Sequence, residues 1–353
     1  MLFLRDRTLL AQPFDAERLK LEGEPTTIAD EVGRRWGTQQ GGFSASQNGV
    51  LTYWSVEPGL QQITLVGREG NTLGIIGEPD HYIYLELSPD EKRVALTRAD
   101  PSSGTFDIWL MELARGVPWR FTFDPASETL PVWSPDGKQI VFGSTRGGPA
   151  NLYRKGSEET GNEELLRASK AQQRPRDWSR DGRYLVYVEI PESSNTSDLW
   201  ALPLAGGESF PLARTEFDEV CGRVSPSGRW LAYTTDESGT DEVYVQAFPR
   251  PGAKRRISNG GGFNPMWRAD EKELFFNSPD GKLMVEDVKS LPTGFVGGEP
   301  RVLFPLQATA WSRWAVYWQP FGDGQRFLIL RPAENSQGKP ITVVTNWQAE
   351  LKR

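Results

Sequence analysis

The sequence has very few of the residues on which most catalytic and metal sites depend. Its 353 residues include one cysteine, Cys221, and one histidine, His81. A single cysteine excludes an intrachain disulfide and a zinc site made of several cysteines. Only His81 is present to serve as the base of a Ser-His-Asp triad, and no Gly-x-Ser-x-Gly turn accompanies it. We therefore expect a chain without catalytic residues, cofactor or metal.

Long hydrophobic runs and an excess of positive charge are also missing. No stretch approaches the roughly 18 apolar residues that a membrane-spanning helix needs. The net charge is −7, which disfavours a broad nucleic-acid surface. We expect no nucleic-acid partner and no membrane insertion by this chain. The compartment stays open, because a protein with one cysteine is compatible with both the periplasm and the cytoplasm.

Glycine (36), proline (26) and tryptophan (13) are abundant instead, and turn-forming residues recur at a regular interval. The repeated unit is Ser-Pro-Asp-Gly or a variant, followed by a short apolar segment. Copies occupy 88–91, 134–137, 179–182 and 225–228, with a degraded copy at 268–271 and weaker ones at 46–49 and 321–324. The five central copies begin 46, 45, 46 and 43 residues apart. The chain therefore has seven repeat phases.

A second motif follows each of four turns at a nearly constant distance. An acidic residue or Asn, an aliphatic residue and Trp or Tyr occur at 107–109, 151–153, 198–200 and 242–244, which is 19, 17, 19 and 17 residues after the matching serine. In the phase of Ser134, short segments rich in β-formers lie at 130–133, 140–143, 151–154 and 164–168. Four strands in each period are typical of propeller blades. We predict an all-β fold, a β-propeller of four-stranded blades with seven repeat phases, and six or eight blades as alternatives.

The repeated turn and the tryptophan before it both have physical reasons. Proline presets φ at the second turn position, Asp bonds its own backbone, and Gly supplies a positive φ. Turn capping therefore explains the recurring Asp better than a metal site does. Trp133, Trp178 and Trp267 stand directly before three of the turns. We expect these indoles to be largely buried between neighbouring blades.

The two ends of the chain resemble parts of a blade. Residues 2–4, 8–11 and 23–25 repeat the plan of 274–276, 282–285 and 298–300, so the chain starts within a blade. Residues 314–318, 326–330 and 341–345 look like the first three strands of another blade. Either the two ends share a blade and close the ring, or the chain is the C-terminal part of a longer protein. We treat 1–353 as a single propeller domain and favour an upstream part.

The paired motifs resemble those of TolB-like, WD-repeat-like propellers over nearly the whole chain. The segments 8–14, 107–113, 121–124 and 341–347 look more closely like the C-terminal propeller of bacterial multidomain serine/threonine protein kinases. That resemblance implies a sensor or protein-interaction domain, an upstream kinase domain and membrane segment, and a periplasmic or extracytoplasmic location. The chain itself has no glycine-rich nucleotide loop, His-Arg-Asp or Asp-Phe-Gly. It therefore carries no kinase activity.

The candidate ligand site is in the loops that lead from one blade into the next. These loops converge on one face of a propeller, around the central channel. They are acidic, and we expect a negatively charged rim that attracts cationic partners, against the simpler interpretation of solvated loop carboxylates. The candidate residues are Asp80, His81, Asp124, Glu128, Glu216, Asp218 and Glu219. His81 is the weakest member, because an ordinary exposed loop histidine explains it as well.

These features favour a non-catalytic binding, sensor or scaffold propeller. Its ligand would be a protein or peptide, with a small molecule as a further class. The first alternative is a metal-dependent propeller hydrolase or lactonase, which requires several carboxylates around one point in the channel. The second is the regulatory propeller of a prolyl-oligopeptidase-like enzyme whose hydrolase domain is absent from this chain.

Overall fold

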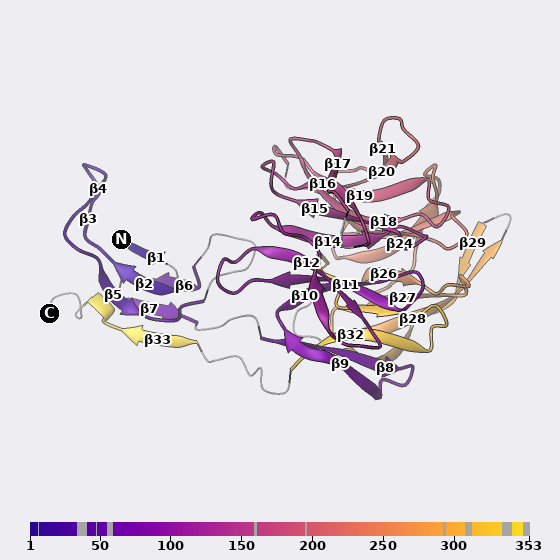
Figure 1. The fold of residues 1–353 in the computed structure, drawn as a ribbon. Coiled ribbons are helices and arrows are strands. Elements are labelled where there is room, and N and C mark those ends of the chain that lie inside the picture. The colour runs from indigo at the N-terminus through magenta and orange to yellow at the C-terminus, as the bar shows by residue number, and fades with distance from the viewer. Residues whose placement is uncertain are drawn as a thin grey trace. The chain divides into compact units, whose positions relative to one another are not determined.

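The computed structural model describes residues 1–5, 7–33, 41–46, 48–54, 59–158, 161–194, 196–291, 294–307, 313–333 and 341–348. Its regular elements in these ranges are all β-strands, β1 to β33 (Figure 1). None of the described segments forms a helix with the length and apolarity needed to cross a membrane. The chain divides into two compact units. Unit 1 comprises residues 1–60, 99–105 and 333–353, and unit 2 comprises 61–98 and 106–332.

Unit 2 contains six antiparallel sheets of the propeller-blade type among its described residues. Blade 1 has β10 (Tyr82–Leu87), β11 (Arg93–Ala99), β12 (Phe106–Glu112) and β13 (Pro118–Arg120). Blade 2 has β14 (Glu128–Trp133), β15 (Gln139–Ser144), β16 (Asn151–Gly156) and β17 (Glu164–Arg167). Blade 3 has β18 (Gln172–Trp178), β19 (Tyr184–Ile190), β20 (Asp198–Pro203) and β21 (Phe210–Ala213).

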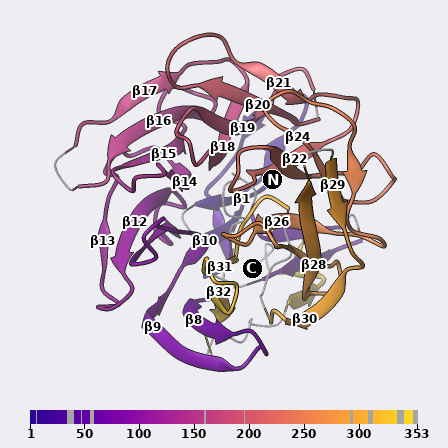
Figure 2. The same cartoon turned by 90° about the vertical axis from the view of Figure 1, so that its right-hand side faces the viewer.

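The other three blades complete the ring. Blade 4 has β22 (Glu219–Val224), β23 (Trp230–Thr235), β24 (Glu242–Ala247) and β25 (Arg255–Arg256). Blade 5 has β26 (Phe263–Trp267), β27 (Glu273–Asn277), β28 (Lys282–Leu291) and β30 (Arg301–Pro305), with β29 (Gly294–Gly297) on the far end of β28. Blade 6 has β31 (Trp318–Pro320), β32 (Arg326–Pro332), β8 (Gln61–Gly67) and β9 (Thr72–Asp80). Figure 2 shows the first strand of each blade nearest to the centre of the ring.

Blade 6 joins early and late parts of the chain and closes the ring. Its inner pair β31–β32 comes from the late part, and β32 pairs with β8 from Arg326↔Gly67 to Pro332↔Gln61. One of the two alternatives from the sequence was that the two ends of the chain share a blade. The structure instead places residues 1–60 and 333–353 in unit 1, and blade 6 is built from β31, β32, β8 and β9. The segments that complete it, 61–67 and 72–80, were not recognised, and 341–345 was expected in their place. The structure instead pairs β33 (Thr342–Thr345) with β7 (Val50–Tyr53) in unit 1.

Every blade-to-blade interface holds an apolar cluster, and these six clusters form the core. Trp133 packs with Ile108 and Leu110 of blade 1, and Trp178 packs with Leu152 of blade 2. Their side chains are 5% and 9% exposed, which confirms the expected burial. Trp267 is half-buried against the cluster of blades 4 and 5. Because flat sheets cover each other best with large side chains, these indoles fill the spaces between blades.

The repeated turn has the hydrogen bonds that its sequence predicts. Ser134 Oγ donates to Asp136 Oδ1 (2.6 Å) and accepts from the amide of Gln139 (2.9 Å), while Asp136 Oδ1 accepts from the amide of Lys138 (3.1 Å). The turns at Ser88 and at Ser179 have the same pattern of contacts. Gly137 takes a φ of 69°, where residues with a side chain are strained. The recurring Asp is therefore a turn cap.

Unit 1 contains the remaining described strands. They are β1 (Leu2–Arg5), β2 (Thr8–Ala11), β3 (Phe14–Asp15), β4 (Lys20–Leu21), β5 (Thr26–Ala29), β6 (Phe43–Ala45), β7 and β33. Sheets β1–β2–β5 and β33–β7–β6 share a small core around Leu9, Leu51 and Trp347. The all-β propeller is confirmed. Six of the seven repeated turns follow the first strands of the six blades of unit 2. The turn at 46–49 lies in unit 1, whereas the sequence was interpreted as one domain.

Candidate functional site at the mouth of the channel

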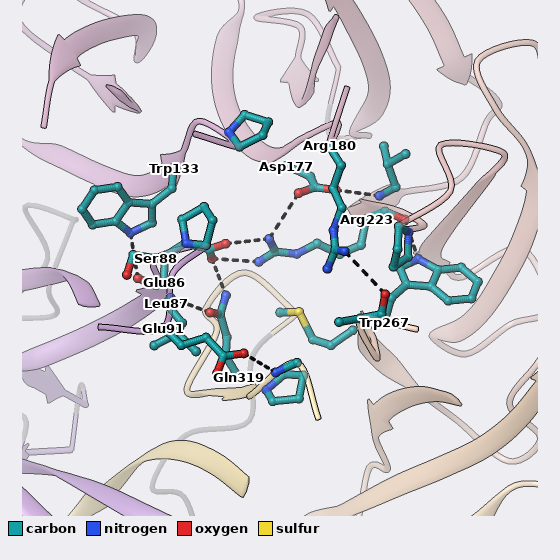
Figure 3. A pocket seen from close by; sticks show the side chains of 18 residues that line it. Glu86, Leu87, Ser88, Glu91, Trp133, Asp177, Arg180, Arg223, Trp267 and Gln319 are labelled. Atoms are coloured by element: carbon teal, nitrogen blue, oxygen red, sulfur yellow. Dashed lines mark hydrogen bonds and ion pairs between the residues drawn. The ribbon is translucent and has the colours of Figure 1, made fainter. Parts of the chain in front are cut away.

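The central channel opens at the face where the inner strands end and the repeated turns begin. A cavity of about 490 Å³ lies there, and residues of all six blades line it (Figure 3). We call it the turn-mouth pocket. One lining residue from each blade, in order, gives Glu86, Trp133, Asp177, Arg223, Trp267 and Gln319. Because every blade contributes, the pocket exists only when the ring is closed.

A buried ion pair crosses the pocket between blades 1 and 4. Arg223 binds Glu86 with both ends of its guanidinium, Nη1 to Oε1 at 3.0 Å and Nη2 to Oε2 at 3.1 Å. Gln319 Nε2 donates to Glu86 Oε2 (2.5 Å), and its Oε1 accepts from the amide of Leu87 (2.6 Å). Tyr84 Oη also donates to Glu86 Oε2 (3.2 Å). Bidentate, charge-assisted contacts of this kind hold both partners in one geometry.

Asp177 is the less satisfied carboxylate of the pocket. Its Oδ2 accepts from the amide of Val224 (2.6 Å), and its Oδ1 lies 3.8 Å from Arg223 Nη1. Burial raises the pKa of the Asp177 carboxyl to about 6, although Arg223 opposes this shift. Towards the rim, Arg180 donates to the carbonyl of Ala269 (3.4 Å). The Asp177 carboxylate therefore has hydrogen-bonding capacity left for a ligand.

The walls of the pocket are apolar and rigid. They include Trp133 and Trp267, each of which donates its indole N–H to a backbone carbonyl of the preceding blade at 3.0 Å. Prolines of three turns and the last residue of β31 add to them, namely Pro89, Pro135, Pro226 and Pro320. Fixed aromatic and proline side chains offer contact area at a low cost in conformational entropy. The pocket thus combines an apolar wall with a few oriented polar groups, as ligand sites commonly do.

The residues needed for a metal site do not come together in the described part of the chain. There, His, Cys, Asp and Glu side chains form no group of three that could hold a metal ion. Cys221 is buried, and its Sγ donates to Asn264 Oδ1 (2.9 Å) and to the carbonyl of Arg313 (2.6 Å). Burial raises the pKa of the Cys221 thiol, so the thiolate needed for nucleophilic attack is disfavoured.

The acidic residues singled out in the sequence lie in three separate groups. Asp80 pairs with Arg98 (2.7 Å) and accepts from the amide of the adjacent His81, which is buried rather than exposed. Asp124 and Glu128 both lie near Arg146, at 3.5 and 3.3 Å. Asp80 is the last residue of β9 in blade 6, directly before blade 1, and Asp124 and Glu128 lie at the beginning of blade 2. Much of the charge of these carboxylates is matched by arginine.

The third group is at the beginning of blade 4. Asp218 pairs with Arg313 (2.5 Å), Glu219 accepts from the Thr215 hydroxyl, and Glu216 is exposed. Each inner strand begins near these carboxylates and ends at the turn-mouth pocket, so the predicted rim and the pocket lie at opposite ends of the inner strands. The ligand-binding role of the rim stays a prediction.

Two of these glutamates occupy equivalent buried positions. Glu128 is the first residue of β14 and Glu219 is the first residue of β22. Each lies five residues before the last residue of its strand, and Gln173 lies five residues before the last residue of β18 in blade 3. All three side chains are at most 1% exposed. Burial raises the pKa of Glu128 and of Glu219 to about 7. These carboxyls therefore change charge near neutral pH.

Sequence reasoning missed the polar residues of the pocket. They stand two positions before the first residue of each repeated turn, where a buried inner strand should be apolar. That position holds Glu86, Val132, Asp177, Arg223, Met266 and Gln319. Four polar residues at one phase of the repeat are a signal that aligning the phases would have detected. The sequence could not show which of them face each other, because that depends on the number of blades.

The six sheets that the described residues form around one channel define a six-bladed β-propeller with a pocket at the channel mouth. Residues 44–220, half of the chain, match the model of the TolB beta propeller domain, and the chain belongs to this family. The structure is similar to that of a putative TolB from Agrobacterium tumefaciens, with a TM-score of 0.63, 18% identity and 78% of this chain and 99% of that one covered. It also matches TolB from Acinetobacter baumannii with a TM-score of 0.50 and 14% identity, covering 97% of this chain and 81% of that one.

Two similar curated proteins have names that refer to peptidases. Tricorn protease homolog 1 of Streptomyces coelicolor is 31% identical over 139 residues, which are 39% of this chain and 12% of that protein. The uncharacterized peptidase YuxL of Bacillus subtilis is 26% identical over 199 residues, which are 45% of this chain and 30% of that protein. The match thus spans less than a third of either relative.

Proposed function

We propose that this propeller is a non-catalytic binding module, and that it binds a segment of a partner protein at the turn-mouth pocket. The observation that carries the proposal is the cavity of about 490 Å³ to which all six blades contribute. This volume is within the range of roughly 300–1,000 Å³ that is usual for ligand sites. Oriented polar groups at the bottom and apolar walls above them suit a peptide that inserts one side chain.

The charges of the pocket favour a ligand with a cationic group. Three carboxylates, those of Glu86, Glu91 and Asp177, line it with two guanidiniums, those of Arg180 and Arg223. Glu86 is saturated by its three partners, whereas Asp177 has free hydrogen-bonding capacity. A lysine or arginine side chain of the partner would supply the missing donor. The indoles at the walls would stabilise such a cation further, by about 0.5–2 kcal/mol.

A second candidate function is that of a regulatory propeller for a peptidase. The names of the two relatives favour it, but the chain matches only 12% and 30% of their lengths. In this interpretation the pocket face would bind a substrate or filter access for a hydrolase elsewhere. The resemblance to kinase-linked propellers supports a sensor role in the same way. All three proposals require that the propeller binds a ligand without reacting with it.

The proposal is tested with peptides selected on the propeller from a random library. We expect the selected peptides to contain Lys or Arg, and Asp177→Asn to weaken their binding about tenfold, which is about 1.4 kcal/mol. The matched control is Asp181→Asn, which changes an exposed turn carboxylate of the same blade that does not line the pocket. Equal binding by wild type and Asp177→Asn would refute the site. Mass spectrometry shows whether a bound peptide is cleaved, and cleavage would refute the non-catalytic role.

A further inference from the structure

Residues 313–316, which lead from blade 5 to blade 6, lie among the inner strands, and we call them the channel segment. Their four consecutive carbonyls each accept a hydrogen bond from a different blade. The donors, in the order of the carbonyls, are Cys221 Sγ of β22 (2.6 Å), Arg176 Nη1 of β18 (3.2 Å), Asn264 Nδ2 of β26 (3.1 Å) and the amide of Leu85 of β10 (3.2 Å). A segment that is bonded to the inner strands of blades 1, 3, 4 and 5 lies in the channel that these strands surround.

Two of the donors stand at strained positions of the backbone. Cys221 and Asn264 both have a φ of 55°, in the left-handed region that residues with a side chain rarely adopt. Each lies where the register of its inner strand shifts, as at a β-bulge, which re-aims a side chain. Leu130, at the same place in blade 2, has a φ of 57° and shares an apolar cluster with Val316. Strain of this kind persists where the surrounding structure holds it, so these bulges serve to hold the channel segment.

Arg313 anchors the channel segment to the loops of blade 4. Its guanidinium pairs with Asp218 (2.5 Å), Asp241 (2.7 Å) and Asp236 (3.6 Å). Asp218 lies directly before β22, and the other two aspartates lie between β23 and β24. Contacts in which both partners are charged are stronger than those between neutral groups. The ion pairs of Arg313 are therefore the strongest attachment of the segment.

The channel segment closes the channel next to the turn-mouth pocket. A void beside the segment is lined by Cys221, Asn264 and Val316, and also by Arg223 and Met266, which line the pocket as well. This void has no room for a water molecule. The channel is therefore filled where the pocket ends, and the segment forms part of the floor below the pocket.

We propose that the channel segment is a releasable plug, and that the ion pairs of Arg313 latch it. The segment lies outside the strands, and side chains rather than a sheet ladder bind three of its four carbonyls. Arg313, Trp314 and Ala315 are only half-buried. With the plug in place the turn-mouth pocket is blind, so a ligand enters from one face of the ring. Release joins the pocket to the opposite mouth.

The experiment uses the full chain and its single cysteine as the reporter. Cys221 is buried, and its Sγ is bonded to the carbonyl of Arg313. Labelling by a small maleimide is followed by mass spectrometry at pH 8, at several urea concentrations below the unfolding transition. Labelling through a local opening depends little on urea, whereas labelling through global unfolding rises steeply with it.

We expect Arg313→Gln to be labelled at least tenfold faster than the wild type, with little dependence on urea. The double variant Asp218→Asn with Asp241→Asn removes the latch from the other side and should have the same effect. All three changes together should label no faster than either set, because both sets remove the same contacts. Arg146→Gln is the matched control and should keep Cys221 protected. Its arginine also pairs with three carboxylates, but they belong to Asp124, Glu128 and Glu163.

Each result decides the proposal. Labelling of Arg313→Gln as slow as that of the wild type overturns the latch, and so does equal acceleration in Arg146→Gln. A labelling rate that rises with urea as steeply as global unfolding overturns it too. If Arg313→Gln does not fold, the aspartate double variant decides in its place. A wild type labelled as fast as an exposed thiol would show an open channel and overturn the plug. Peptide binding is not measured, so failure here is distinct from failure at the turn-mouth pocket.

Discussion

The buried Glu128 makes a quantitative prediction about stability and pH. Its side chain is fully buried, Oε1 accepts from Ser144 Oγ (2.8 Å), and Oε2 has no partner. We consider the substitution Glu128→Gln. The amide keeps the acceptor for Ser144 and removes the buried negative charge. Gln173 occupies the equivalent place in blade 3 and is fully buried as well, so the fold already accommodates glutamine there.

The size and sign of the effect follow from the pKa. Burial raises the pKa of the Glu128 carboxyl from 4.5 to about 7. The folded state therefore holds a proton that the unfolded state releases between pH 4.5 and 7. Stability falls as the pH rises through this window, and the full penalty is present above pH 7. Since one pKa unit corresponds to about 1.4 kcal/mol, the ionised carboxylate costs about 3 kcal/mol at pH 8.

The assay is denaturant unfolding of both proteins at several pH values from 4.5 to 8.5. We expect Glu128→Gln to be more stable than the wild type by about 2–3 kcal/mol at pH 8 and close to it at pH 4.5. Glu219→Gln, at the equivalent place in blade 4, should behave in the same way, and the double variant should be roughly additive. If the free energy of unfolding depended on pH in the same way for the wild type and the variant, the assignment of a protonated carboxyl would be refuted. A loss of stability at pH 8 would show that the contact with Arg146 outweighs the burial of the charge.

Four further outcomes are expected. Trp133→Ala removes a buried indole and its hydrogen bond to Glu86, and should cost about 3–5 kcal/mol of stability in a thermal melt. Arg223→Met removes the cation that pairs with the buried Glu86 and should cost about 3–5 kcal/mol of stability, most of which the double variant with Glu86→Gln should recover in a mutant cycle. Cys221 should not react with a thiol reagent in the native protein and should react after unfolding. A serine-directed fluorophosphonate should not label the chain, and labelling that depends on one serine would contradict the non-catalytic proposal.

Much of the fold was accessible from the sequence because propeller blades are built from short-range patterns. The turn at Ser134 is specified by its own proline, aspartate and glycine, and the structure shows the hydrogen bonds that these residues predict. The blade of the third phase was read as strands at 130–133, 140–143, 151–154 and 164–168, and β14 to β17 follow these bounds closely. Local turn chemistry and strand periodicity are encoded within each period of the repeat.

Other features depend on contacts between distant segments. The segments β8 and β9 follow no clear repeat motif, and they become blade strands only because β32 offers its free edge to β8. The carboxylates predicted at the rim were located near the inner strands, but arginines such as Arg98 and Arg146, which match their charge, come from other positions of the repeat. A sequence pattern with a period of one blade cannot specify such pairings.

The turns, the strand order and the buried tryptophans of each blade follow from residues that are neighbours in the chain, so the sequence alone determined them. Closure of the ring, by contrast, was decided by tertiary structure, because it depends on how many blades pack side by side. Only closure places Glu86 of blade 1 against Arg223 of blade 4, 137 residues away. The same closure forms the turn-mouth pocket. Burial makes the pairing of these separate polar residues decisive, since a charge away from water must find a partner.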